Sequence, residues 1–152
     1  MRNLTVIAMV LVATTCGRGI ADVKRVRADV TFSTNSGAPV ALAVGIADTP
    51  AERQKGLSGV THITDGGVAF LYAYPATGEF WMKDTLIPLS VAFVRADGTI
   101  VAIWEMTPCT ADPCRTYASP EPYTLAIETT PSWYREHHIV VGDSAVLGAT
   151  AP

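Results

Sequence analysis

The sequence EFWMKDTLIPLSVAF, residues 79–93, places chemically capable side chains directly beside a strand pattern. Its first six residues include two aromatic side chains, a methionine, a lysine and an aspartate, and the remainder is mainly apolar. Apolar side chains at alternating positions are typical of a strand that buries one face. We therefore expect five side chains in the interior of a sheet, namely Trp81, Leu86, Leu89, Val91 and Phe93.

Three consecutive polar residues, Lys83, Asp84 and Thr85, lie between the two apolar parts of this stretch. Loops held between rigid strands are frequent places for binding groups. The three residues are therefore candidates for ligand binding. Trp81 beside them has two interpretations, as a core residue or as a flat platform on which a ligand packs.

The surrounding sequence predicts a mostly β domain. Short apolar runs alternate with turn sequences such as NSGAP at residues 35–39 and ADG at residues 96–98. We expect seven or eight short strands and two short helices, which is typical of a small single-domain β-barrel or sandwich. The expected strands lie near Val30 and Phe32, at residues 40–47, 67–74 and 79–82, in a hairpin at 87–106, at 123–129 and within 142–147.

Two helix starts can be recognised in the sequence. Thr49 precedes Pro50 and lies three residues before Glu52, which is the pattern of a capping box with proline at the first helical position. Thr130 followed by Pro131 predicts a second, short helix in the same way.

Composition limits the range of functions. The 152 residues are 49% hydrophobic and 16% charged, with a formal net charge of −3. A chain of this length and composition can bury a sizeable core in one domain. Nothing in this charge balance indicates nucleic acid as a partner.

The N-terminal residues 1–21 have the pattern of an export signal. Arg2 is followed by an apolar run at residues 4–13 that is too short to span a bilayer. Two processing routes remain open, lipidation of Cys16 or cleavage after Ala21. The protein is therefore expected in the cell envelope or outside the cell, with a lipid anchor at Cys16 as its one expected membrane contact.

The two remaining cysteines, Cys109 and Cys114, lie in the sequence MTPCTADPCRTY. An even pair in an exported domain indicates a disulfide. A redox pair usually has two intervening residues, and no second Cys or His pair is near enough in sequence to complete a metal site. We predict a structural disulfide that closes a short loop.

Arg53, Lys83 and Glu128 are the charged residues most suited to a site. Arg53 lies in the first predicted helix, and Glu128 ends a strand in which Ile127 and Glu128 should face opposite sides. One interpretation is a pocket for an anionic or polar ligand, with Glu128 orienting the ligand. The other is an ion pair between Arg53 and Glu128 that ties the helix to the barrel.

No cofactor or metal is expected. Phosphate-loop and dinucleotide motifs are missing from the sequence. His137 and His138 follow a short predicted helix, where a histidine usually interacts with the last carbonyl groups. We assign neither them nor His62 to a metal site.

Several segments together resemble the domain-of-unknown-function family numbered 192. They are Arg53 with KGL at 55–57, FWMKDTLIPLSVAF at 80–93, DGTIV at 97–101, LAIE at 125–128 and VVGD at 140–143, in this order. The resemblance covers residues 40–147 and implies a small, mostly β barrel with short helices and no established activity. It divides the chain into the signal at 1–21, an N-terminal strand region at 22–38 and a family core domain at 39–149.

The chain departs from the family pattern by three substitutions, and the glycine that usually follows the LE strand is also absent. Ser58 replaces a common methionine, Asp84 a common asparagine, and Ser90 an aspartate that often follows Pro-Leu. If that aspartate is a metal ligand or an acid–base group in the family, this chain lacks it, although a serine hydroxyl can still form hydrogen bonds. The change at Ser90 therefore weakens the case for an enzyme.

Three functions remain open from the sequence. The first is a module that binds a small polar or anionic ligand through Arg53, Trp81 and Lys83. The second is an accessory interaction domain of an envelope complex, with an envelope protein as its partner. The third is a hydrolase or lyase that uses Glu128 or Asp84 as its base.

Overall fold

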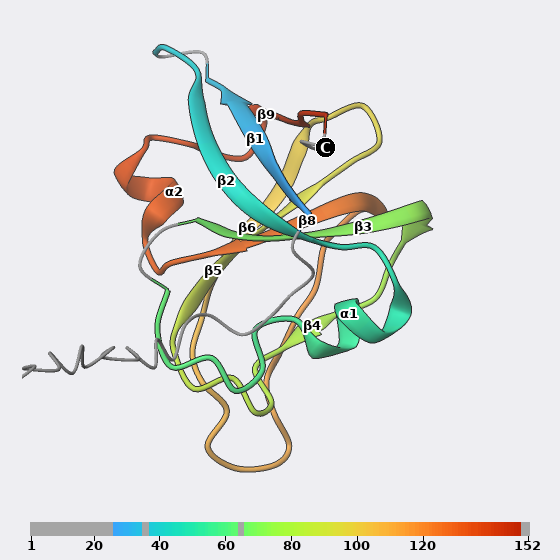
Figure 1. Ribbon diagram of the computed structural model, residues 1–152, viewed down its shortest axis with the longest axis vertical. Coiled ribbons are helices and arrows are strands. Elements are labelled where there is room, and N and C mark those ends of the chain that lie inside the picture. Colours follow the sequence, from blue (N-terminus) through green and yellow to red (C-terminus); the bar gives the residue numbers. More distant parts are fainter. Residues whose placement is uncertain (1–25, 35–36, 64–65, 150–152) are drawn as a thin grey trace, which may run out of the picture.

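The structure is a computed structural model and describes residues 26–34, 37–63 and 66–149. Strands dominate this part of the chain, as predicted, together with two short helices (Figure 1). The export signal predicted at residues 1–21, with Cys16, lies outside the described residues. No helix within the described ranges is long and apolar enough to cross a membrane. The elements are β1 Arg27–Ser33, β2 Val40–Ala47, α1 Pro50–Lys55, β3 Gly67–Ala76, β4 Phe80–Trp81, β5 Leu89–Val94, β6 Ile100–Met106, β7 Thr116–Tyr117, β8 Tyr123–Thr129, α2 Trp133–Glu136 and β9 Ser144–Leu147.

Seven of the described strands form one curled sheet in the order β6-β5-β8-β3-β2-β1-β9. All neighbouring pairs are antiparallel except β2 and β3, which are parallel and are joined through α1. The curl brings the two ends of the sheet together, where Thr99 pairs with Ser144 and the Ala145 N–H donates to the Gly98 carbonyl at 2.8 Å (Figure 1). The fold is therefore barrel-like, with β4 and β7 as a separate small sheet.

The central strands are buried on both faces because two apolar cores lie on opposite sides of the sheet. On β5, Ala92 and Val94 belong to the first core, while Val91 and Phe93 belong to the second. In the first core, Phe32 contacts Trp133 and Tyr134 of α2, at ring-centroid distances of 5.4 and 5.8 Å. These aromatic contacts pack α2 against the barrel. The second core includes Met82, Phe93, Tyr117, Tyr123 and Ala126, with Phe80 packed against it.

The first helix has the predicted start. The Glu52 backbone N–H donates to the Thr49 hydroxyl at 3.2 Å, and the Glu52 carboxylate accepts from the Thr49 N–H at 3.0 Å. Pro50 occupies the first turn, where a missing N–H has no cost. None of the residues of α1 is buried, so its position depends on contacts made by its side chains.

The structure corrects the expectation for Trp81 and Leu86, whose side chains are 57% and 60% exposed. The strand β4 is only two residues long, and Met82 after it is buried instead. The Met82 carbonyl accepts from the backbone N–H groups of Thr85 and Cys109 at 3.1 and 3.3 Å. These bonds hold Met82 in the core and leave Trp81 outside it. The other expected interior side chains are buried as predicted, namely Leu89, Val91 and Phe93.

The second helix begins later than predicted from Thr130. Its N-cap is Ser132, which has a positive φ of 66° and makes no side-chain capping bond. The Ser132 N–H donates instead to the Ser90 hydroxyl at 2.9 Å and to the Glu105 carboxylate at 3.0 Å. These long-range bonds determine the turn, and the helix follows at Trp133–Glu136.

Candidate functional site

A pocket of about 330 Å³ lies between α1, β3, the β4 region and the end of β8. Five of the six residues that the sequence indicated as ligand-binding candidates line it, and the exception is Asp84. The five are Arg53, Trp81, Lys83, Thr85 and Glu128. Nine further residues line it, which are Gln54, Lys55, Gly56, Leu57, Ser58, Phe70, Tyr72, Glu79 and Phe80.

Glu128 is the most unusual side chain of the pocket. It lies in β8 between Val68 of β3 and Val91 of β5, and only 5% of it is exposed. Ala126, two residues earlier on the same face, belongs to the second core, whereas Ile127 belongs to the first. Burial raises the pKa of Glu128 to about 8, because a carboxylate loses its hydration in this position. The carboxyl group is therefore mainly protonated at neutral pH.

The Glu128 carboxyl group has no hydrogen-bond or ion-pair partner within the described residues. No fully buried side-chain oxygen or nitrogen in the described part of the chain lacks a partner. The carboxyl oxygens must therefore keep contact with the pocket that they line. A polar group in this position has hydrogen-bonding capacity that water or a ligand can satisfy.

Thr85 is a second polar residue that lines the pocket and has hydrogen-bonding capacity left unused. It is 8% exposed, and its backbone N–H donates to the Met82 carbonyl at 3.1 Å. Its hydroxyl has no partner among the described residues and, by the same reasoning as for Glu128, must contact the pocket. A hydroxyl can both donate and accept a hydrogen bond. Two buried polar residues thus line one cavity with unused hydrogen-bonding capacity.

Arg53 ties α1 to the sheet, but not through the predicted ion pair. One guanidinium nitrogen donates to the backbone carbonyls of Asp48 at 2.6 Å and Leu71 at 2.9 Å. The guanidinium carbon also lies 4.8 Å from the centre of the Tyr72 ring. The ion-pair interpretation with Glu128 is wrong, because Arg53 binds carbonyl groups and Glu128 has no charged partner in the described structure.

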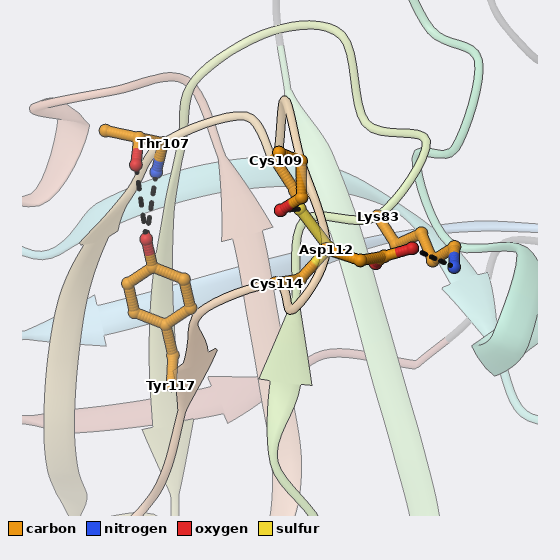
Figure 2. The surroundings of a disulfide bond; sticks show 7 residues. Lys83, Thr107, Cys109, Asp112, Cys114 and Tyr117 are labelled. Carbon is orange, nitrogen blue, oxygen red and sulfur yellow. Dashed lines mark hydrogen bonds and ion pairs between the residues drawn. A yellow bond between two sulfur atoms is a disulfide. The ribbon is translucent and has the colours of Figure 1, made fainter.

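Lys83 connects the pocket with the disulfide loop. Its ammonium group forms an ion pair with Asp112 at 3.3 Å (Figure 2). The same group lies 6.0 Å from the centre of the Trp81 ring. The predicted disulfide between Cys109 and Cys114 is present in the structure. Asp112 lies within the loop that this disulfide closes. The ion pair is solvent-exposed on both sides, which leaves Lys83 able to exchange Asp112 for another anion.

The far side of this loop is anchored by Tyr117. The Tyr117 side chain is buried, and its hydroxyl accepts a hydrogen bond from the Thr107 N–H at 3.1 Å (Figure 2). Cys109, Asp112 and Cys114 also form a cluster of metal-type ligands within 4.8 Å of one another. Both sulfurs are used in the disulfide, so the cluster offers no thiolate to a metal ion.

The other residues considered from the sequence lie elsewhere. Asp84 has a positive φ of 57°, and its carbonyl accepts from the Gly59 N–H at 2.8 Å, so it forms a turn beside the pocket. The Ser90 hydroxyl accepts a hydrogen bond from the backbone N–H of Ser132, the N-cap of α2. The His137 ring stacks on Trp133, and its Nδ1 lies 2.8 Å from the Trp133 carbonyl oxygen. This agrees with the predicted role of a histidine at a helix end.

The pocket has a positive formal charge. Arg53, Lys55 and Lys83 contribute three positive charges and Glu79 contributes one negative charge, while protonated Glu128 contributes none. The sum is two positive charges at neutral pH. Sequence reasoning assigned neither Lys55 nor Glu79 to the site. The place of Lys55 depends on the connection that carries α1 between the parallel strands β2 and β3, and the place of Glu79 depends on the segment that leads from β3 into β4.

The chain belongs to the DUF192 family, described as “Uncharacterized ACR”, whose model matches residues 31–147. No protein of the curated set matches the chain. Among solved structures, it is similar to a candidate transcription regulator from Sinorhizobium meliloti 1021, with a TM-score of 0.73 and 27% identity over 80% of this chain and 93% of that one. It is also similar to a protein of unknown function from Novosphingobium aromaticivorans DSM 12444, with a TM-score of 0.71 and 28% identity over 78% of this chain and 83% of that one.

Proposed function

We propose that the protein is an exported binding protein that takes a small polar or anionic ligand in the pocket at Glu128. The observation that carries this proposal is the pair of buried residues, Glu128 and Thr85, whose polar groups lack partners in the described structure and line a positively charged cavity. A volume of about 330 Å³ suits a small molecule, since ligand pockets usually measure about 300–1,000 Å³.

Two features support export. The first is the signal-like pattern at residues 1–21, with either lipidation of Cys16 or cleavage after Ala21. The second is the disulfide between Cys109 and Cys114, because disulfides persist mainly in oxidising compartments. Mass spectrometry of the protein isolated from its own cells tests the proposal. A mature N-terminus at residue 22 or a lipidated Cys16 supports export, and an intact N-terminus in the cytoplasmic fraction overturns it.

Binding is favoured over catalysis by the composition of the pocket. Among the described residues, Ser58 is the one serine that lines the pocket, and no histidine lines it to activate a nucleophile. Glu128 and Glu79 are the carboxyl groups among the described lining residues that could serve as an acid or base, and the family aspartate position is occupied by Ser90. The regulator description of the Sinorhizobium protein has no electrostatic support here, since a DNA-binding surface is basic and this chain has a net charge of −3.

An interaction domain is a second candidate, because one groove beside β6 is mainly apolar. It is lined by Val101, Ile103, Trp104, Pro120 and Val141 among others, and Trp104 and Val141 are exposed. Exposed apolar surface of this kind is typical of contact sites for proteins. The groove is distinct from the pocket at Glu128, so the two functions can be tested separately.

A thermal-shift screen of the purified protein, with its disulfide intact, tests ligand binding. The compounds are neutral sugars, sugar acids, inorganic phosphate, simple carboxylates and divalent metal ions. A ligand at a hundred times its Kd stabilises the folded state by about 2.7 kcal/mol, which raises Tm by roughly 5 °C or more in a protein of this size.

The matched variants for this screen are Lys83→Ala in the pocket and Arg27→Ala on the exposed surface of β1. We expect a shift that Lys83→Ala reduces and Arg27→Ala leaves unchanged. If every compound is silent, or if the shifts are equal in both variants, the pocket is not the binding site. A silent screen with a cooperative melt favours the interaction domain.

A further inference from the structure

Three surfaces of the pocket differ in chemistry, and each selects a different part of a ligand. The positive side chains of Arg53, Lys55 and Lys83 lie on α1 and after β4. The exposed indole of Trp81 lies beside Lys83. The buried polar groups of Glu128 and Thr85 belong to the sheet and to the turn that follows β4. A ligand that satisfies all three surfaces carries three corresponding groups.

The positive side selects an anion. Arg53 already uses one guanidinium nitrogen for two carbonyl groups, so its role is mainly to contribute charge and to hold α1. Within the described part of the chain, the ion-pair partner of Lys83 is the exposed Asp112, and replacing this contact costs little. Glu79 lines the same pocket and repels a second negative charge. This arrangement suits a ligand with one carboxylate better than a multiply charged one.

The indole of Trp81 selects a flat group of low polarity. Its side chain is 57% exposed although it lines the pocket, and such exposure of a large aromatic ring has no role in the core. The face of an indole ring carries partial negative charge and attracts the partially positive C–H groups of a saturated ring. The C–H face of a sugar ring provides such a surface.

The buried groups select hydroxyls. A protonated carboxyl group offers one donor and one acceptor, and a threonine hydroxyl offers the same combination. A ligand hydroxyl, which also donates and accepts, can satisfy either group completely. A ligand without polar groups at this position would leave both buried groups without partners, which costs binding free energy.

We propose that the ligand is a monocarboxylic sugar acid, with its carboxylate near Lys83, its C–H face on Trp81 and its hydroxyls on Thr85 and protonated Glu128. This inference rests on the proposed binding function and specifies its ligand class. A negative charge on Glu128 would repel the carboxylate of such a ligand, so binding of the ligand is coupled to pH.

The coupling depends on the charged and titratable groups that surround Glu128. Arg53 and Lys55 come from α1, Tyr72 from β3, Glu79 from the segment before β4 and Lys83 from the segment after it. Tyr134 of α2 interacts electrostatically with Glu128 and with Glu105 of β6. Burial raises the pKa of Tyr134 well above 10, so Tyr134 stays neutral from pH 6 to pH 9. No histidine among the described residues lines the pocket, which leaves Glu128 as the proton-binding group in this range.

Calorimetric titration of the purified protein with glucuronate, galacturonate and gluconate tests the ligand class. Glucuronamide lacks the charge of glucuronate, and cyclohexanecarboxylate keeps the charge and a ring but lacks the hydroxyls. We expect at least one sugar acid to bind about tenfold more tightly than both cyclohexanecarboxylate and the neutral amide. Trp81→Ala should weaken this binding, while Tyr74→Ala, which removes an exposed aromatic ring outside the pocket, should not.

The pH dependence gives a second readout. With a Glu128 pKa of about 8, about one tenth of the protein has an uncharged Glu128 at pH 9. The Kd of an anionic ligand that binds this uncharged form should therefore rise about tenfold between pH 6 and pH 9. Glu128→Gln keeps a hydrogen-bond donor at all pH values, and its Kd should be nearly constant over this range. Thr85→Val, which preserves shape without the hydroxyl, should weaken binding at both pH values.

The outcomes separate this inference from the proposed function. If phosphate or cyclohexanecarboxylate binds as tightly as the sugar acids, and Lys83→Ala weakens that binding, the pocket binds anions but the sugar-acid assignment fails. If a sugar acid binds with the same pH dependence in wild type and Glu128→Gln, the role of Glu128 is overturned. If neither these compounds nor those of the thermal-shift screen bind, both proposals fail.

Discussion

Glu128 shows how strongly the pKa of one side chain depends on the position of that residue in a sheet. The same residue at the exposed end of a strand would be an ordinary carboxylate. Between β3 and β5, it is almost completely removed from water, and no cationic residue in the described ranges forms an ion pair with it. Its protonated form is therefore favoured, and this preference affects folding as well as binding.

Glu128 should make the folded protein less stable as pH rises. Burial raises its pKa from an ordinary 4.5 to about 8, so between these values the folded state holds a proton that the unfolded state releases. The free energy of unfolding should fall through this window by roughly 3–5 kcal/mol and then level off above pH 8. Glu128→Gln should remove the decrease and be the more stable protein at pH 9.

Urea unfolding between pH 5 and pH 9 measures this effect. The Glu52 and Asp97 carboxyl groups have pKa values lowered by their hydrogen bonds to Thr49 and Arg95, and their contribution changes below this window. Equal slopes for wild type and Glu128→Gln would show that Glu128 does not titrate as the structure indicates.

Residue patterns predicted some positions well and others in the wrong orientation. The alternation in LAIE correctly placed Ile127 and Glu128 on opposite faces, because β8 is long enough to define a phase. The two-residue strand β4 defines no phase, so the sequence could not show that Met82 rather than Trp81 enters the core. The partners of Arg53 are backbone carbonyls, which no residue pattern reveals.

At the level of elements, the disulfide loop is a short segment that brings a negative charge to Lys83, one of the residues that line the pocket. Cys109 and Cys114 are five residues apart, and Asp112 between them meets Lys83. The sequence predicted the disulfide from the cysteine pair alone. The contact with Lys83 joins residues 29 positions apart, and it could only be found from the structure.

Replacing both cysteines by serine should lower the free energy of unfolding by about 2 kcal/mol, because a cross-link over so short a loop removes little entropy from the unfolded chain. Asp112→Asn, which keeps the disulfide, should cost at most about 1 kcal/mol, since the ion pair is exposed. Thermal unfolding with and without a thiol reductant checks both values. If reductant lowers Tm of the wild type and of the double serine variant equally, the disulfide is not the source of the effect.

For the helix α1 too, the sequence predicts the contacts between neighbouring residues but not those between distant parts of the chain. Thr49 and Glu52 predict its first turn from four consecutive residues, and the predicted bonds are present. Its role as the connection between the parallel strands β2 and β3 was not predicted, because parallel pairing is not encoded in the alternation of either strand. That connection is what brings Lys55 to the pocket.

For the whole molecule, the space between β3 and β8 at Gly67 limits which side chains the sheet can tolerate. A Cβ at Gly67 would overlap the Glu128 carbonyl oxygen, because the two atoms would lie far closer than van der Waals contact allows. Gly67 and Thr129 are paired residues at the end of this strand pair. The pairing that positions Glu128 therefore requires glycine at position 67.

Gly67→Ala should reduce stability by several kcal/mol, roughly the cost of an overpacked core, because the clash involves backbone that cannot move freely. Gly78→Ala is the matched control, since its Cβ would meet only the Tyr123 hydroxyl at an ordinary 3.7 Å. Circular dichroism during urea unfolding compares the two variants. A Gly67→Ala protein as stable as Gly78→Ala would mean that β3 and β8 can separate locally without loss of the fold.

One consequence follows from the lack of buried residues in α1. Local openings with a low free energy occur where few apolar contacts must be broken. The amide hydrogens of α1 should therefore exchange with solvent much faster than those of β5 and β8, which are buried on both faces. The helix α1, with Arg53 and Lys55, can then open locally while β8, with Glu128, stays folded. A bound ligand would be detected first as slower hydrogen exchange in α1.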